Sequence, residues 1–241
     1  MTLLHAMSAA DVAALAIFAI CWLGYERLLK RLVRGPDTIN THMTIIRAAW
    51  MRNMASRDGR LIDSQLLGHA ITSATFFASA NLIIIAAAAG ALFGGDKVIQ
   101  GVVVAPLVAS APGVLLKAKL ALVVIALGRG LLAFVWAIRQ MNYCLAAIGA
   151  APPLDADPAE QRDFGDAAGQ VLNPALSAFN AGVRGYYFAL AAGAWLLGPL
   201  AFALASIGAA SLLAWRQSAS TSAVGVRRLR ALIEKRASAE S

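Results

Sequence analysis

The segment that decides the fold occupies residues 64–95 and reads SQLLGHAITSATFFASANLIIIAAAAGALFGG. It carries no formal charge when His69 is counted as neutral. A helix that crosses a hydrocarbon core of about 30 Å needs about 20 mostly apolar residues. Because this segment exceeds that length, it predicts a membrane-spanning helix.

The composition of the whole chain agrees with a bilayer as its main solvent. Apolar residues make up 59% of the 241 residues and charged residues 14%, and the mean hydropathy is +0.67. A soluble domain has about 45–50% apolar and about 25% charged residues. The composition therefore excludes a disordered chain and a disulfide-stapled scaffold. The net charge of +8 indicates cationic loops against anionic lipid and not a nucleic-acid partner.

Three further segments meet the same criterion, and together they define the predicted architecture. We expect an all-α fold, an integral membrane helical bundle with about four transmembrane helices plus an interfacial amphipathic helix. The helical membrane domain covers residues 1–215, and a basic C-terminal tail follows at 216–241. The hydrophobic segments are about 8–25, 66–94, 118–139 and 185–215.

The distribution of lysine and arginine leaves the topology open. Residues 26–63 hold eight of these cations and the tail holds six, and both counts favour the cytoplasm. Four simple crossings would place the two regions on opposite sides. Three alternatives follow: a four-helix protein with its basic tail outside, a fourth segment divided at Gly198-Pro199 into a hairpin or two short crossings, or entry of residues 98–116 into the membrane.

Residues 38–66 have the pattern of a helix that lies in the membrane interface. Apolar side chains recur every three or four positions from Ile39 to Trp50, Pro36-Asp37 marks the turn before the helix, and Asp58-Gly59 is expected to end it. A plain cytoplasmic connector is the alternative. The candidate contacts to lipid or to a soluble partner are Arg47, Trp50, Arg52, Arg57 and Arg60.

The loop after the third hydrophobic segment begins with prolines and acidic residues. We expect a short helix from Glu160 to Leu172 and a restart of the chain at Asn173-Pro174. The acidic residues lack the Asp-x-Asp-x-Asp-Gly order that wraps calcium. A solvated acidic face is therefore the favoured interpretation.

Arg129 lies in the middle of the third hydrophobic segment, between Gly128 and Gly130. A charge at the centre of a membrane helix costs about 2.5–3.5 kcal/mol, so this side chain should face protein or water. One hypothesis makes Arg129 an anion contact on a polar path. In the structural alternative it pairs with Asp11 or Glu26, or extends to the interface.

One face of the second hydrophobic segment would supply a wall for such a path. Its polar members are Gln65, His69, Thr72 and Ser79, which recur at helical spacing. Similar groups also join membrane helices without any transport role. Small residues predict close helix contacts within the chain or in a homo-oligomer: Gly90, Gly94, Gly185, Ala189 and Gly193.

The sequence offers no catalytic motif, and we expect no enzyme activity, metal site or cofactor. The three histidines, His5, His42 and His69, lie far apart in the chain and lack the spacing of a metal site. Cys21 and Cys144 fall in or beside predicted spans, which argues against a zinc pair or a structural disulfide.

Five short motifs appear in a recognisable order. The most specific is SATFFASANLII at 73–84; the others are RAAWM at 47–51, RLIDSQ at 60–65, RQMNYC at 139–144 and NAGVRGYYF at 180–188. This order resembles the family called domain of unknown function 599, multi-pass membrane proteins of bacteria and plants, over about residues 10 to 215. The resemblance implies about four membrane helices and supplies no reaction, ligand or catalytic residue.

The leading functional hypothesis is a small transport or channel-like membrane protein with its polar path near Arg129. The alternative is a non-catalytic membrane scaffold or partner-binding subunit, in which the same polar residues join helices. The expected surroundings are a lipid bilayer, in the inner (cell) membrane of a bacterium. A small ion or solute and further copies of the chain in a homo-oligomer are the other expected partners, and no nucleic acid is expected.

Overall fold

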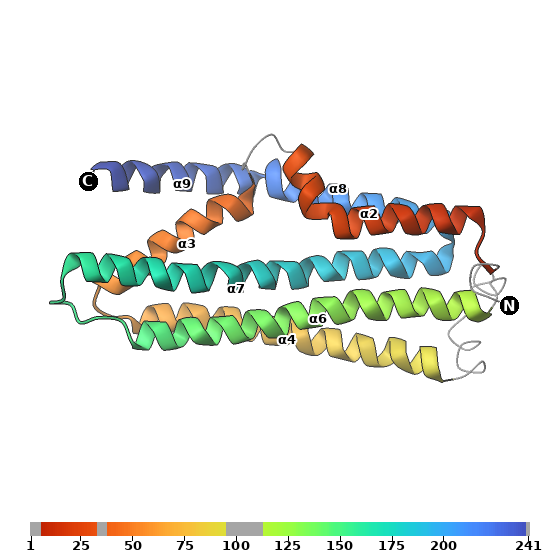
Figure 1. Ribbon diagram of the computed structural model, residues 1–241, viewed down its shortest axis with the longest axis horizontal. Helices are drawn as coiled ribbons and strands as arrows, with labels where there is room; N and C mark the ends of the chain where they lie inside the picture. Colours follow the sequence, from red (N-terminus) through yellow and green to blue (C-terminus); the bar gives the residue numbers. More distant parts are fainter. Residues whose placement is uncertain (1–5, 33–37, 95–112, 240–241) are drawn as a thin grey trace. The chain divides into compact units, whose positions relative to one another are not determined.

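The computed structural model describes residues 6–32, 38–94 and 113–239, apart from the side chains at 26–28 and 30–32, and its regular structure there is helical. Figure 1 labels α2 (Ala9–Leu32), α3 (Ile39–Ser56), α4 (Leu61–Phe93), α6 (Gly113–Gly149), α7 (Pro158–Gly193), α8 (Pro199–Ser218) and α9 (Thr221–Ala239). The short 3-10 helix η1 (Ala194–Leu197) lies between α7 and α8 in the sequence.

Hydropathy along these helices confirms the predicted all-α membrane fold. Within the described residues, three stretches are long and apolar enough to cross a membrane, namely Leu61–Phe93, Gly113–Gly149 and Pro199–Ala239, and Ala9–Tyr25 is a shorter apolar helix. Most of the predicted stretch 98–116 lies outside the described residues, so the alternative that places it in the membrane is not addressed.

The chain forms two compact units, and α4, α6, α7 and α8 each contribute to both. The first unit consists of Met1–Leu32, Ala78–Leu132 and Gly182–Ala214, and the second of Val33–Phe77, Ala133–Ala181 and Trp215–Ser241.

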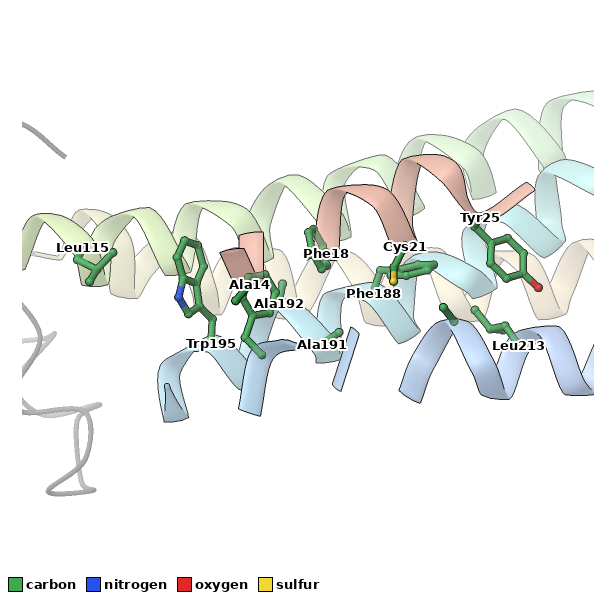
Figure 2. Close-up of a cluster of buried hydrophobic side chains, with 12 residues drawn as sticks. Ala14, Phe18, Cys21, Tyr25, Leu115, Phe188, Ala191, Ala192, Trp195 and Leu213 are labelled. Carbon is green, nitrogen blue, oxygen red and sulfur yellow. The ribbon is translucent and has the colours of Figure 1, made fainter. Parts of the chain in front are cut away.

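Aromatic side chains build the core of the first unit. The Phe18 ring of α2 lies 5.0 Å from Phe202 of α8, and Trp195 of η1 stacks on Phe202 with ring centroids 4.9 Å apart. Figure 2 shows Trp195 and Tyr25 toward opposite ends of this cluster. Burial of several aromatic rings stabilises the packing of α2, α7 and α8.

The fourth predicted hydrophobic segment is divided, as one of the sequence alternatives proposed. Helix α7 passes into η1, and Gly198 then takes φ +124°, a conformation that side chains rarely adopt. Pro199 follows as the first residue of α8, where its missing N–H is tolerated. Because Phe188 before the break and Phe202 after it share one core, the two helices form a hairpin.

Glycine permits a close approach of α6 and α7 in the first unit. A Cβ atom on Gly185 would lie 2.9 Å from the Cα of Gly130. Beside this contact, Asn81 of α4 is buried and donates from Nδ2 to the carbonyl oxygen of Leu127 at 2.9 Å. The predicted contact at Gly185 is confirmed, whereas Cβ atoms at Gly90 and Gly193 would meet nothing within 4 Å in the described part of the chain.

The second unit is held together by an unusually close pair of helices, α3 and α7. A Cβ atom on Gly165 would lie 2.5 Å from the Cα of Arg52, and one on Gly169 would lie 3.2 Å from the Cα of Ala48. The two glycines are four residues apart and therefore share one face of α7. We call this contact the α3–α7 seam.

Helix α7 runs without interruption past Asn173-Pro174, so the predicted restart of the chain there is wrong. The proline removes one backbone hydrogen bond, but its neighbours Leu172 and Ala175 are fully buried. The Nδ2 atom of Asn173 also donates to the carbonyl oxygen of Thr44 at 3.2 Å. Packing against α3 therefore compensates for the lost hydrogen bond.

Helix α3, the helix expected in the membrane interface, ends where the sequence predicted. Thr38 caps α3 by accepting a hydrogen bond from Thr41, α3 ends at Ser56, and Gly59 takes φ +76° in the turn to α4. The predicted turn at Pro36-Asp37 lies outside the described residues.

Helix α9, the basic tail, packs against α3. A guanidinium nitrogen of Arg230 lies 3.2 Å from Nδ1 of His42, and the side chain of Gln217 accepts from the backbone N–H of Asn40 at 3.3 Å. This packing is consistent with a tail that lies on the same side of the membrane as α3, and the topology stays a prediction.

Candidate functional site

Helix α3, the start of α7 and the end of α9 surround an open cavity of about 620 Å³, which we call the basic groove. Its volume falls within the range of about 300–1,000 Å³ typical of small-molecule sites. Its wall combines apolar and cationic side chains. The apolar members are Ile46, Ala49, Trp50, Pro158, Ile233 and Ala237, the cationic members are Arg52, Arg57, Arg162 and Arg236, and the uncharged polar members are Asn53, Ser56 and Gln161.

Two of the four arginines are held by carboxylates. The Nε atom of Arg52 lies 2.5 Å from an oxygen of Asp166 on α7. Arg57 pairs with Asp63, which is fully buried and also accepts a hydrogen bond from the indole N–H of Trp50 at 2.6 Å. These contacts fix the Arg52 and Arg57 side chains and the Trp50 ring at the wall of the groove.

Arg162 adds an exposed positive charge to the groove, and Arg236 adds a cationic side chain from α9. Arg162 is exposed and has no ion-pair or hydrogen-bond partner among the described residues, and Arg236 is exposed on α9. Among the described side chains that line the groove, none is a carboxylate. Guanidinium groups recognise carboxylate and phosphate oxygens through paired hydrogen bonds. The groove is therefore suited to an anion with an apolar portion.

Local sequence fixes the start of α7, which carries Arg162. Asp157 accepts a hydrogen bond from the backbone N–H of Ala159 at 3.0 Å, as a capping residue does. Gln161 is buried and donates to the carbonyl oxygens of Pro153 and Leu154 at 3.1 and 3.0 Å. The proline-rich loop is thereby tied to the first turn of α7.

Two of the predicted contact residues, Arg60 and Arg47, do not line the groove. Arg60 donates to the carbonyl oxygens of Ala151 and Ala55 at 2.9 and 3.0 Å, which ties the loop before α7 to the end of α3. Arg47 is buried, and its Nε and Nη1 atoms have no partner among the described residues. Burial lowers the pKa of the Arg47 guanidinium, because desolvation disfavours its charged form.

The predicted polar stripe lies on the outer surface of α4. Gln65, His69, Thr72 and Ser79 are all exposed, and the Thr72 hydroxyl donates to the carbonyl oxygen of Gly68 at 3.0 Å. Such a bond satisfies a hydroxyl without a second helix. The stripe would line a path only if another molecule covered it, and its role in transport stays a prediction.

Arg129 is exposed on α6, with its guanidinium carbon 5.7 Å from the ring centroid of Trp22. This geometry fits a cation–π contact. Its first predicted partner, Asp11, accepts other hydrogen bonds, and the side chain of Glu26 lies outside the described part. Arg129 and Ser79 belong to the first unit, whereas Gln65, His69 and Thr72 belong to the second.

A buried polar cluster in the first unit escaped the sequence analysis. Asp11 accepts from the Trp195 indole N–H at 2.8 Å and from the Ser8 hydroxyl at 2.6 Å. Lys119 is also buried, with its ammonium 5.8 Å from the Trp195 ring centroid. The Ser8-x-x-Asp11 spacing matches a capping box, which is the one local signal for this cluster.

Neither metal nor thiol chemistry has support in the described part of the chain. It contains no group of three or more histidine, cysteine, aspartate or glutamate side chains placed to hold a metal ion. Cys21 and Cys144 are both free and buried.

The long apolar helices and basic connecting segments define a helical, multi-pass membrane protein by length and composition. Comparison with known families narrows this class. The family model described as a protein of unknown function, DUF599, matches residues 13–222, and the chain belongs to this family. No curated protein and no solved structure matches the chain.

Proposed function

We propose that this chain is a non-catalytic membrane protein that binds an anionic partner at the basic groove. The observation that supports this function is the convergence of four arginines, from three helices and the turn after α3, on one cavity whose described lining has no carboxylate. We assign the protein to the inner (cell) membrane of a bacterium, with α3 and α9 on the cytoplasmic side, where basic segments accumulate.

The arrangement favours binding over a purely structural role for these cations. Arg52 and Arg57 have carboxylate partners, but Arg162 is exposed without one among the described residues. Like charges that converge on one cavity repel each other, and an anion placed between them relieves that repulsion. The negative charges of such an anion would be held by side chains that α3 and α7 already position.

Titration with inorganic pyrophosphate tests this function directly. Calorimetry in a neutral detergent should give saturable binding to the wild-type protein. The double variant Arg162→Gln/Arg236→Gln should bind about tenfold more weakly for each guanidinium removed. The control Arg228→Gln/Lys235→Gln removes the same charge from exposed positions of α9 outside the groove lining, and should bind like wild type. Equal loss in both double variants would contradict the proposal.

Transport is the second candidate function, and the position of Arg129 favours it. This guanidinium is exposed on a helix that is otherwise apolar enough to cross a membrane. An exposed charge at the centre of a membrane-spanning helix costs about 2.5–3.5 kcal/mol. A polar path, lined in part by a second copy of the chain, would reduce this cost.

Ion flux into proteoliposomes distinguishes the second function from the first. If the chain transports small ions, Arg129→Gln should change the flux of chloride or potassium at matched reconstitution, and Arg162→Gln should not. Wild-type proteoliposomes that pass neither ion would argue against this candidate and leave anion binding at the groove as the function to pursue.

A further inference from the structure

The basic groove has two chemically different parts, and together they specify an amphiphilic ligand. Guanidinium groups of Arg52, Arg57, Arg162 and Arg236 line it together with the aliphatic side chains of Ile46 and Ile233 and the ring of Trp50. A small inorganic anion would use only the cationic part. A ligand that fills the groove needs an apolar portion next to its negative charge.

Charge alone does not separate a phosphate from a carboxylate, but the arrangement of the guanidinium groups bears on the choice. Arginines of α3, of the turn after it, of α7 and of α9 line one cavity, and the oxygens of a tetrahedral phosphate point to several sides, whereas the two oxygens of a carboxylate lie in one plane. Arginine is the preferred residue where phosphate oxygens are bound through paired hydrogen bonds. The groove therefore matches the phosphate group of an amphiphile.

The location of the groove determines where such a phosphate comes from. Helix α3 supplies six of the thirteen lining residues, and its sequence has the pattern expected of a helix in the membrane interface. Helix α9 follows α8 directly in the sequence and contributes Ile233, Arg236 and Ala237. Basic side chains on such helices face the headgroups of anionic phospholipids.

We infer that the basic groove binds the phosphate group of an anionic phospholipid, with the headgroup between the four arginines and the adjoining glycerol and first methylenes against Ile46, Trp50 and Ile233. This inference rests on the proposed function and names its ligand. The groove is open, so the acyl chains can remain in the surrounding bilayer.

Thermal unfolding in a neutral detergent tests the inference with three ligands at equal phosphate concentration. The ligands are dioleoylphosphatidylglycerol, dioleoylphosphatidylcholine and soluble glycerol 3-phosphate. At about 100 times its dissociation constant, phosphatidylglycerol should raise the unfolding midpoint of the wild-type protein by about 5–10 °C. Phosphatidylcholine and glycerol 3-phosphate should raise it by much less, because the first is neutral overall and the second lacks the apolar portion.

Two matched double variants locate the effect. Arg162→Gln/Arg236→Gln should reduce the shift produced by phosphatidylglycerol to about 1–2 °C, since affinity falls about a hundredfold. Arg228→Gln/Lys235→Gln should retain the wild-type shift. Should the groove double variant fold poorly, the single exposed substitution Arg162→Gln should still reduce lipid affinity about tenfold.

The outcomes separate the inference from the function on which it rests. A glycerol 3-phosphate shift as large as that of phosphatidylglycerol, lost in the groove variant, would overturn the lipid assignment and leave anion binding intact. A phosphatidylglycerol shift that is identical in both double variants would overturn the lipid site. If, in addition, pyrophosphate binding is identical in the two variants, the proposed function fails as well.

Discussion

Substitution of Gly165 by alanine should weaken the α3–α7 seam and with it one wall of the groove. The new Cβ atom would lie 2.5 Å from the Cα and 2.9 Å from the N of Arg52, and 3.0 Å from the carbonyl oxygen of Met51. Carbon atoms pack at about 3.5–4.0 Å. Because all three contacts are with backbone atoms, no side-chain rotation relieves them, and the two helices must separate by about 1 Å.

The net effect is the difference between this overpacking and the better helix propensity of alanine. Overpacking costs about 1–3 kcal/mol, and contact with backbone favours the upper half of that range. Alanine in place of glycine stabilises a helix interior by about 1 kcal/mol. We therefore expect a loss of about 1–2 kcal/mol, or an unfolding midpoint lower by about 2–8 °C for a chain of this length.

The matched control is Gly225→Ala in α9, where an added Cβ would meet nothing within 4 Å among the described residues. This variant should be as stable as wild type or more stable, since only the propensity of alanine acts. Thermal unfolding of both variants in the same detergent measures the contrast. If Gly165→Ala proved as stable as Gly225→Ala, the reasoning about the seam would be refuted.

Three further predictions follow from buried polar groups and from the packing of the tail. Trp195→Phe removes the indole donor to Asp11 and should lower the free energy of unfolding, measured by thermal unfolding, by about 1–3 kcal/mol. The control substitution Trp136→Phe, at an exposed position, should change it little. Arg47→Met removes a buried charge and should raise the free energy of unfolding by about 1 kcal/mol or more, and the unfolding midpoint with it; a lower midpoint would contradict a lack of partners for its Nε and Nη1 atoms. A topology reporter fused after Trp215 should give a cytoplasmic signal, because the tail packs on α3, and an external signal would contradict that topology.

The sequence was sufficient for the parts of the fold that depend on local pattern. An uncharged run as long as 64–95 has few alternatives to a membrane helix, and the turn at Asp58-Gly59 has a strong local signal. Gly198-Pro199 likewise marked the break in the last hydrophobic segment. The predicted restart of the chain at Pro174 was wrong because its neighbours are buried in the core, and this packing, which a local sequence rule does not include, keeps α7 continuous.

The groove could not be predicted because its members are distant in the sequence. Trp50, Arg52 and Arg57 were selected as contacts of a surface helix, and they do line the cavity. Arg162 and Arg236 stand in segments more than 100 residues away, and only the packing of α7 and α9 on α3 brings them to the same site. No spacing rule links positions in three separate helices.

The contacts of buried polar groups could not be predicted from the sequence either, because they also join distant residues. Arg47 and Arg60 belong to the same basic series as Arg52 and Arg57 in the sequence, yet they do not line the groove. The contact of Asp11 with Trp195 joins residues 184 positions apart. Charge patterning predicts which segments are basic, whereas tertiary packing decides which arginines line the groove.

Chemical protection of individual arginines tests the groove most directly. The protein is treated with phenylglyoxal in a neutral detergent, with and without inorganic pyrophosphate, and modification of each arginine is read by mass spectrometry. An anion in the groove should protect Arg162 and Arg236, while Arg228, exposed on the same helix as Arg236, should react equally in both samples. Equal protection of Arg228, or no protection of Arg162 and Arg236, would contradict a binding site in the groove.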